Sequence, residues 1–462
     1  MSLTNLLNTA RDALAAQTYG LNVAGGNVAN ANTPGYVRRD AILETTNIGT
    51  QTTGSVDVAG LRRATDQYLN QRTYDASGQS SSAGERDQEL ASIEALVSGA
   101  ANGGLGDAMS QLFSSFSALA ANPNDTTVRQ TVLSAASNFA QRANDLGNSI
   151  SQQRADVMKE AQSVADEVNQ HASALARLNQ QIALALNAGQ DAADLQDRRD
   201  QELAALSQLV DTRAFTNQAG QMVVQVSGTT LVEGQVARTI SVDLDGNDRM
   251  RILATTPGST PKDVTAFLSG GRLAGLRDAR DTDLKQVGDR LDQFVFDVAT
   301  AVNGQHAAGV GLDGNGGRPL FSISPAAQAA ARAISVDSSI AGHPEFVAAS
   351  ADAGALPGGS DNAVALSRLS TFTFASGGRT GAEAFGDLVG DIASRKAQSA
   401  DVFGLKKAME DQVTQLKESQ SGVSLDEEMV SLTKFQRAFE AASKVLQTAD
   451  QLMQELLDRI GR

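Results

Sequence analysis

Both ends of the chain carry the pattern of a helix that packs along one side against another helix. Near the N-terminus, apolar or small residues alternate at steps of three and four, with Gln17 at the one polar position: Leu3, Leu7, Ala10, Leu14, Leu21, Ala24 and Val28. The C-terminal segment repeats the pattern at Leu432, Phe435, Phe439, Ala442, Leu446, Ala449, Met453, Leu456 and Ile460. This spacing is the heptad seam of a coiled coil. One such helix would pack on the chain's own core, but two matching seams favour pairing with each other or with neighbouring copies.

Specific signals mark where these two helices end and begin. The string NVANANTPGYVRRD at residues 27–40 ends the first, because Asn and Gly tolerate left-handed backbone and Pro34 pushes the residue before it out of helical geometry. Before the last helix, Ser424 is expected to be the N-cap, with Glu427 at the capping-box position.

The chain between the two seams reads as a helical body with an inserted β region. Residues 40–65 look extended, 66–210 largely helical with one very long helix over 125–188, and 271–307 and 380–420 helical again. Residues 211–268 alternate as strands do, and 309–378 form a Gly-rich, loop-like stretch. The predicted fold class is mainly α with an inserted β domain: paired N- and C-terminal coiled-coil-like helices, a long-helix body and a small all-β outer domain.

These patterns divide the chain into three expected domains. Residues 1–36 plus 422–462 form a terminal helical assembly domain. Residues 37–210 plus 271–421 form a mainly helical body, and 211–270 form a small β-rich insert.

Composition excludes several classes of function. The net charge is −15 and the basic residues cluster no further than pairs such as Arg38-Arg39, Arg62-Arg63 and Arg198-Arg199, so nucleic-acid binding is not expected. The absence of cysteine excludes disulfides and thiolate-bound metals. No stretch approaches the roughly 18 apolar residues of a membrane span, and no signal core is visible, so these rules alone indicate a cytoplasmic protein.

No motif predicts catalysis, a cofactor or a metal. His171 lies among polar residues and is expected to be solvated, and His306 and His343 lack metal-ligand spacing. The string DLDGND at 243–248 fails as a calcium loop at its sixth and twelfth positions and reads as a hairpin turn. The Gly-rich string at 312–321 reads as a turn that presents Phe321 to a core.

Acidic pairs offer no clearer signal of chemistry. Asp281 and Asp283 fall in a charge-rich helical stretch and are expected on a solvated face. The sequence therefore predicts a protein that is not an enzyme.

The string NVANANTPGYVRRD at residues 27–40 resembles the ANxNTPGY signature of the axial proteins of the bacterial flagellum, which include rod, hook and hook-associated proteins. Asn27, Asn30 and Asn32 match, as does the run Thr33-Pro34-Gly35-Tyr36. Two further parts of the chain are similar to the hook-associated protein 1 family. The C-terminal part matches at Leu425-Asp426-Glu427-Glu428-Met429, Phe435-Gln436 and Thr448-Ala449-Asp450, and the interior part matches at Asn303, His306, Gly309 and Gly314 to Gly317.

The resemblance implies a structural protein that forms a ring of subunits where the hook meets the filament. Its implied partners are further copies of itself, hook protein, a second hook-filament junction protein, and an export chaperone that binds the C-terminal helix. It also implies export through the flagellar type III pathway without a cleaved signal peptide, which revises the cytoplasmic expectation to an extracellular place in the flagellum. The alternatives are a hook or distal-rod axial protein and, with less support, a secreted enzyme whose catalytic insert lies within 211–378.

The candidate site is therefore an assembly surface rather than a catalytic centre. The residues expected to form it are Leu3, Leu7, Leu14, Leu21, Val28, Asn30, Asn32, Thr33, Pro34, Gly35, Tyr36, Leu432, Phe435, Phe439, Leu446, Met453, Leu456 and Ile460.

Overall fold

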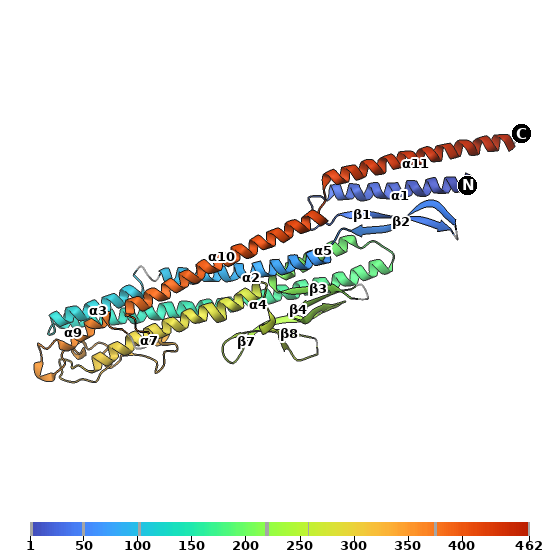
Figure 1. Ribbon diagram of the computed structural model, residues 1–462. Helices are drawn as coiled ribbons and strands as arrows, with labels where there is room; N and C mark the ends of the chain where they lie inside the picture. Colours follow the sequence, from blue (N-terminus) through green and yellow to red (C-terminus); the bar gives the residue numbers. More distant parts are fainter. Residues whose placement is uncertain are drawn as a thin grey trace.

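The two helices with heptad seams lie along each other at one end of an elongated molecule in the computed structural model (Figure 1). α1 spans Leu3–Ala29 and α11 spans Leu425–Ile460, so the predicted pairing of the chain ends is confirmed. A hairpin of β1 (Arg39–Ile48) and β2 (Gln51–Arg63) packs on α1. The structure describes residues 3–48, 51–99, 103–217, 221–256, 258–373 and 377–460.

Long helices that run lengthwise form the body (Figure 1). They are α2 (Gln67–Gly99), α3 (Leu105–Ala121), α4 (Thr126–Asn187), α5 (Ala193–Leu209), α6 (Arg272–Asp278), α7 (Lys285–Ala307) and α10 (Gly381–Ser421). The very long helix expected over 125–188 is α4, and Asp125 caps it by accepting a hydrogen bond of 2.7 Å from the backbone N–H of Thr127. α10 packs on both α2 and α7, which returns the chain to the end where α1 lies.

The core consists mostly of Ala, Leu and Val, as the scarcity of aromatic residues requires. Buried Ala136, Ala143 and Ala172 let neighbouring elements approach α4 closely. Phe321 is buried against Phe139 with a ring-centroid distance of 5.8 Å, which confirms its predicted place in the core. Dense packing of small side chains thus replaces large aromatic anchors.

The predicted β region is present as two small sheets beside α4 (Figure 1). The first sheet contains β3 (Thr212–Thr216), β4 (Met222–Val226), β5 (Thr229–Glu233) and β6 (Val236–Ala237), and the second β7 (Thr239–Leu244), β8 (Met250–Thr255) and β9 (Lys262–Asp263). Asn169 of α4 holds the backbone of Ile240 through two hydrogen bonds of 2.9 and 2.7 Å. Asn179 donates to the carbonyls of Met222 and Gly234, so two asparagines of α4 attach both sheets.

The string DLDGND forms the predicted turn between β7 and β8. The Asp245 carboxylate accepts hydrogen bonds from the backbone N–H groups of Asn247 and Arg249 at 2.8 and 2.9 Å. Asp248 has a left-handed φ of 58°. The hairpin interpretation of this string is therefore confirmed.

The stretch expected to be loop-like contains short elements joined by turns. They are β10 (Phe321–Ser322), α8 (Ala330–Ala333), β11 (Ser335–Val336) and α9 (Asp361–Arg368). The buried side chain of Arg129 fastens this stretch to α4, since its guanidinium donates to the carbonyls of Pro123 and Val347. Across the ranges that the structure describes, no helix has the length and apolar character needed to cross a membrane.

Gly271 marks the closest approach between elements of the body. It precedes α6 with φ +80°, and its N–H donates to the carbonyl of Gly78 in α2 at 2.7 Å. A Cβ at this position would lie 2.3 Å from the backbone nitrogen of Val210. Both the backbone angle and the available space therefore require glycine here.

Gly271→Ala should lower the free energy of unfolding by at least about 2 kcal/mol, because the new methyl group meets backbone atoms that cannot move aside. Urea denaturation measures the loss. Gly304→Ala, in α7 where nothing lies within 4 Å of the new Cβ, is the control and should be neutral or stabilising by up to about 1 kcal/mol. Equal effects of the two substitutions would contradict the close approach.

Candidate assembly site

The string at residues 27–40 folds into a turn built around the buried side chain of Asn27. Its Oδ1 accepts hydrogen bonds from the Tyr36 hydroxyl at 2.9 Å and from the backbone N–H of Arg39 at 3.1 Å. Its Nδ2 donates to the backbone carbonyl of Arg39 at 2.8 Å. One carboxamide thus joins the last turn of α1 to the first residue of β1, and burial raises the pKa of Tyr36, which keeps its hydroxyl a donor.

The other residues of the motif shape the surface of this turn. Asn30 donates to a backbone carbonyl one helical turn earlier at 2.9 Å, and its Oδ1 accepts from the Thr33 hydroxyl at 3.2 Å. Gly35 has φ +77°, and a Cβ there would lie 2.1 Å from the side-chain nitrogen of Gln201. That nitrogen donates to the Pro34 carbonyl at 2.8 Å. The motif therefore needs glycine where α5 comes closest.

Ion pairs attach the turn and the hairpin to α5. Arg39 pairs with Asp194 and with Asp197, the latter at 2.9 Å. Arg63 donates to Asp197 at 2.8 Å and to Asp200 at 2.7 Å. Asp197 is buried and bridges the two guanidinium groups, so the connection between hairpin and body is a shared network rather than separate surface pairs.

The junction of α10 and α11 rests on the same turn. The backbone N–H of Arg38 donates to the carbonyl of Ser421 at 3.0 Å, and its guanidinium donates to Glu427 at 2.8 Å. Ser424 lies at the predicted N-cap, with its hydroxyl 3.5 Å from the backbone nitrogen of Glu427. The reciprocal half of the predicted capping box is wrong, because the carboxylate of Glu427 is taken by Arg38.

Contact between α1 and α11 includes a small residue outside the predicted seam. A Cβ at Gly20 would lie 2.5 Å from a ring carbon of Phe435, so the ring packs directly on the backbone of α1. The fully buried residues of α1 are Ala10, Ala16, Gly20, Ala24 and Asn27. Sequence reasoning included only two of these in the seam, because a heptad search rewards large apolar side chains.

Most of the residues predicted for assembly are partly or fully exposed to solvent in the single chain. Leu3, Leu7, Leu14, Leu21, Val28, Asn30, Tyr36, Leu432, Phe435, Leu446 and Met453 are half-buried. Asn32, Thr33, Pro34, Gly35, Phe439 and Leu456 are exposed, and the side chain of Ile460 lies outside the described part. The two helices therefore pair within one chain, but many of the side chains in both seams stay exposed to solvent.

α11 exposes more apolar surface than its seam accounts for. Met429, Val430, Phe439, Val445, Leu452, Leu456 and Leu457 form what we call the uncovered apolar stripe of α11; Val430 is 70% exposed and Leu457 64%. Aliphatic residues repeated along one helix and left in solvent mark an interaction surface. Phe439 and Leu456 belong to the predicted seam, and the other five lie outside it, because a heptad seam describes one side of a helix only.

The histidines serve structure rather than chemistry. His306 is fully buried; its Nδ1 lies 2.8 Å from the carbonyl of Arg318, and its Nε2 accepts from the backbone N–H of Ala348 at 3.0 Å. Burial lowers the pKa of His306 to about 4, so the ring is neutral. His171 was expected to be solvated, which is wrong: it is half-buried, and its Nδ1 lies 2.7 Å from a Glu202 oxygen.

The expectation that Asp281 and Asp283 lie on a solvated face is also wrong. Asp283 is fully buried and accepts hydrogen bonds of 2.7 and 2.9 Å from the guanidinium of Arg86. Asp281 accepts from the backbone N–H of Met250 at 2.7 Å. Residues Ala279–Leu284 form a wide π-type turn between α6 and α7, which changes the phase of the helix and turns these acids inward.

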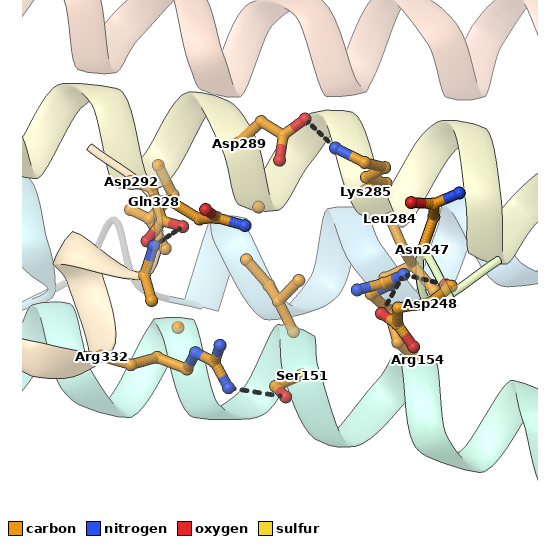
Figure 2. A pocket seen from close by; sticks show the side chains of 15 residues that line it. Ser151, Arg154, Asn247, Asp248, Leu284, Lys285, Asp289, Asp292, Gln328 and Arg332 are labelled. Carbon is orange, nitrogen blue, oxygen red and sulfur yellow. Dashed lines mark hydrogen bonds and ion pairs between the residues drawn. The ribbon is translucent and has the colours of Figure 1, made fainter. Parts of the chain in front are cut away.

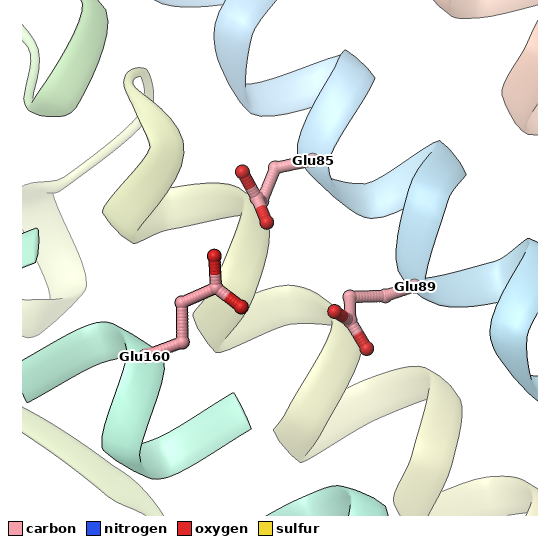
Figure 3. A group of neighbouring side chains, drawn as sticks. All are labelled: Glu85, Glu89 and Glu160. Carbon is pink, nitrogen blue, oxygen red and sulfur yellow. The ribbon is translucent and has the colours of Figure 1, made fainter. Parts of the chain in front are cut away.

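Three glutamates meet between α2 and α4, with one ligand atom from each within 4.8 Å of the others (Figure 3). Arg272 neutralises part of their charge, pairing with Glu85 at 2.8 Å and with Glu160 at 2.6 Å. Glu89 accepts a hydrogen bond from Gln153 at 2.8 Å, and burial raises its pKa. This group holds the helices together through the shared guanidinium of Arg272 and the hydrogen bond from Gln153.

The pocket between α4, α7 and the loop near α8 has a volume of about 460 Å³ (Figure 2). Its charged groups pair with each other or with nearby polar groups: Arg154 with Asp248 at 2.9 Å, Lys285 with Asp289 at 2.6 Å, and Arg332 with Ser151 at 3.2 Å. Among the described residues that line it, no nucleophile lies beside a base. The arrangement suits a solvated groove better than a catalytic site.

Comparison with known proteins places these features in a family. The family profile of the flagellar hook-associated protein FlgK helical domain matches residues 90–321. Profiles of the flagellar basal body rod FlgEFG protein C-terminal region and of the flagella basal body rod protein match residues 417–459 and 7–36. The three matches cover much of the helical body, from the last part of α2 through α7, and most of both terminal helices.

Individual relatives agree with these profiles. The chain is 28% identical over 331 residues to flagellar hook-associated protein 1 of Salmonella typhimurium, an alignment of 70% of this chain and 60% of that protein. It is 26% identical over 502 residues to the Bacillus subtilis protein of the same name, covering 98% of each. The structure of the flagellar hook junction protein FlgK from Burkholderia pseudomallei shares the fold, with a TM-score of 0.67 at 18% identity over 77% of this chain and 100% of that one.

The helical-domain profile matches half of the chain, so the chain belongs to the flagellar hook-associated protein FlgK family, a family of structural flagellar proteins. The family resemblance expected from the terminal motifs is confirmed. The helical-domain match also extends through the β sheets at 211–268, which none of the strings that carried the sequence resemblance includes.

Asn27→Ala should open the turn between α1 and β1. It leaves the Tyr36 hydroxyl and the backbone of Arg39 without their partner, at a cost of about 1–3 kcal/mol. Amide hydrogen exchange at Arg39 should become faster by about tenfold or more. Asn32→Ala, at an exposed position of the same motif, is the control and should leave this exchange unchanged. Unchanged exchange in the Asn27 variant would contradict the turn.

His306 should make stability depend on pH. Its folded pKa of about 4 lies below the unfolded value of about 6.5, so its contribution is complete above pH 6.5 and is lost as pH falls toward 4. The stability difference between wild type and His306→Gln should shrink by about 2 kcal/mol from pH 7.5 to pH 5 in urea denaturation. His343→Gln, at an exposed ring, should stay within about 0.5 kcal/mol of wild type at both pH values. A constant difference for the His306 variant would refute the assignment.

Proposed function

We propose that this chain is a structural subunit of the bacterial flagellum that forms a ring joining hook to filament. The observation that carries the proposal is the uncovered apolar stripe of α11, which a single chain leaves in water. Neighbouring copies that pack side by side would bury it together with the half-buried leucines of α1. Relatives named as hook-associated and hook junction proteins support this place for the ring.

Each of the three domains would occupy a different part of such a ring. Residues 1–36 plus 422–462 form the assembly domain around the central axis, and 37–210 plus 271–421 form the next shell. Residues 211–270 form the outer insert, consistent with sheets that lie on the side of α4 (Figure 1). The motif turn around Asn27 is where the chain passes from the first shell to the second.

The partners follow from the same surface. Hook protein and a second hook-filament junction protein would bind the two ends of the ring. Before assembly, an export chaperone would cover α11, because an exposed apolar helix otherwise aggregates. The chain would then leave the cell through the flagellar type III pathway without a cleaved signal peptide.

The main alternative is a hook or distal-rod axial protein, since rod-protein profiles match both terminal helices. The profile that spans residues 90–321 favours the junction, because it belongs to the hook-associated family. A secreted enzyme has less support, since the charged groups around the pocket between α4 and α7 pair with one another or with a nearby hydroxyl group.

Deletion of the gene tests the junction directly. We expect cells with intact hooks and no filaments, and with flagellin released into the medium, as seen by electron microscopy and immunoblotting. Cells without hooks would contradict the proposal and favour a rod or hook protein.

Complementation with point variants tests the stripe. Leu452→Glu places a charge on the uncovered apolar stripe and should fail to restore swimming, whereas Gln451→Glu, at the exposed neighbouring position, should restore it. Both purified variants should show wild-type circular dichroism, because both side chains are exposed in the single chain. Full swimming with the Leu452 variant would contradict assembly through the stripe.

A further inference from the structure

Arg199 of α5 is a buried cation that forms no direct ion pair within the described residues, although Asp200 interacts with it at longer range. Its residue is 8% exposed, and its Nε is buried with no acceptor. Within the described ranges no carboxylate forms an ion pair with it, unlike Arg39 and Arg63, which share the acids of the same helix. The neighbouring Asp200 is held by Arg63 at 2.7 Å. A desolvated guanidinium left unpaired is costly, which points to a missing acceptor.

A small cavity lies beside Arg199. It has a volume of about 90 Å³ and lies where the end of β2, the start of α2, α5 and β3 meet. Arg63 and Arg199 line it, and Thr65, Gln67 and Asn70 add hydroxyl and amide groups to the wall. Since a water molecule takes about 30 Å³, the space suits a few waters or one small ion.

The charges around the cavity favour an anion. Lys417 is a further cation close by: burial lowers its pKa, and it interacts with both Arg63 and Asp200. The one carboxylate in the cavity wall is Asp200, whose charge Arg63 already offsets at 2.7 Å. The wall therefore offers hydrogen-bond donors and two guanidinium groups beside a single carboxylate, which is the chemistry that holds an oxyanion.

We propose that this cavity binds a small tetrahedral oxyanion of the phosphate or sulfate class, with the guanidinium of Arg199 as its principal partner. The bound anion ties together the hairpin, α2, α5 and the first strand of the β insert, all of which contribute to the wall. This site is independent of the proposed role at the junction, because every element that forms it belongs to the single chain.

Calorimetric titration of the full chain with sodium phosphate, at constant ionic strength set by sodium chloride and at pH 7.5, tests the proposal. Wild type should bind saturably, and Arg199→Met should bind at least about tenfold more weakly, because it loses a charge-assisted hydrogen-bonding group. Arg198→Met removes the adjacent, exposed arginine and should bind within twofold of wild type. No saturable binding, or equal binding by the Arg199 variant, would overturn the site.

Two further measurements keep the outcome clear. In phosphate-free chloride buffer, Arg199→Met should melt no lower than wild type, because it removes an unpaired buried charge. A large fall in its melting temperature would overturn the proposal by showing that the guanidinium already has a partner in the protein. Titration with sodium acetate should give weaker binding than phosphate, and tighter binding of acetate would overturn the oxyanion class in favour of a carboxylate.

Discussion

The pairing of the first helix with the last fixes where the rest of the chain can lie. Because α1 and α11 come from opposite ends of the sequence, everything between them must leave from and return to one end of the molecule. α4, with 62 residues, reaches about 90 Å at the usual rise per residue, and α10 helps to close the loop along α2. The elongated body follows from this one long-range contact.

Polar contacts, rather than a continuous apolar core, join the paired helices to the body. Asn27, Arg39 and Arg63 bind the backbone and acids on either side of the joint, with Asp197 bridging the two arginines. Such contacts are directional, so they fix an angle between two rods, whereas apolar packing would tolerate sliding. The proposed anion beside Arg199 would add a further contact at the same joint.

Local and periodic features of the fold were predictable from the sequence. The pairing of the terminal helices, the long helix over 125–188 and the turn at 243–248 depend on spacing or on neighbours within a few residues, and all three are present. The inward orientation of Asp283 depends on a π-type turn and on Arg86, nearly two hundred residues away, which no local pattern reports.

The candidate site divides in the same way. The sequence around Asn27 was recognisable as the end of a helix. Its partner Arg39, however, is one of two adjacent arginines, and nothing in the sequence distinguishes it from Arg38. How far each arginine of such a doublet is covered depends on which helix packs opposite, which is a tertiary property. The exposure of the seam side chains could not be predicted, because a pattern of apolar residues does not say how much of it a partner helix covers.

Because α1 pairs with α11, the surface that these two helices form depends on the presence of both. A chain cut short between the β sheets and α11 would keep α4 and the strands that its asparagines hold, yet it would lack the partner of α1 and the acceptor of Arg38 at Glu427. In the proposed ring, the surface that a neighbouring subunit would meet therefore needs α11 as well as α1. Incorporation into such a ring would then discriminate against copies that lack either helix.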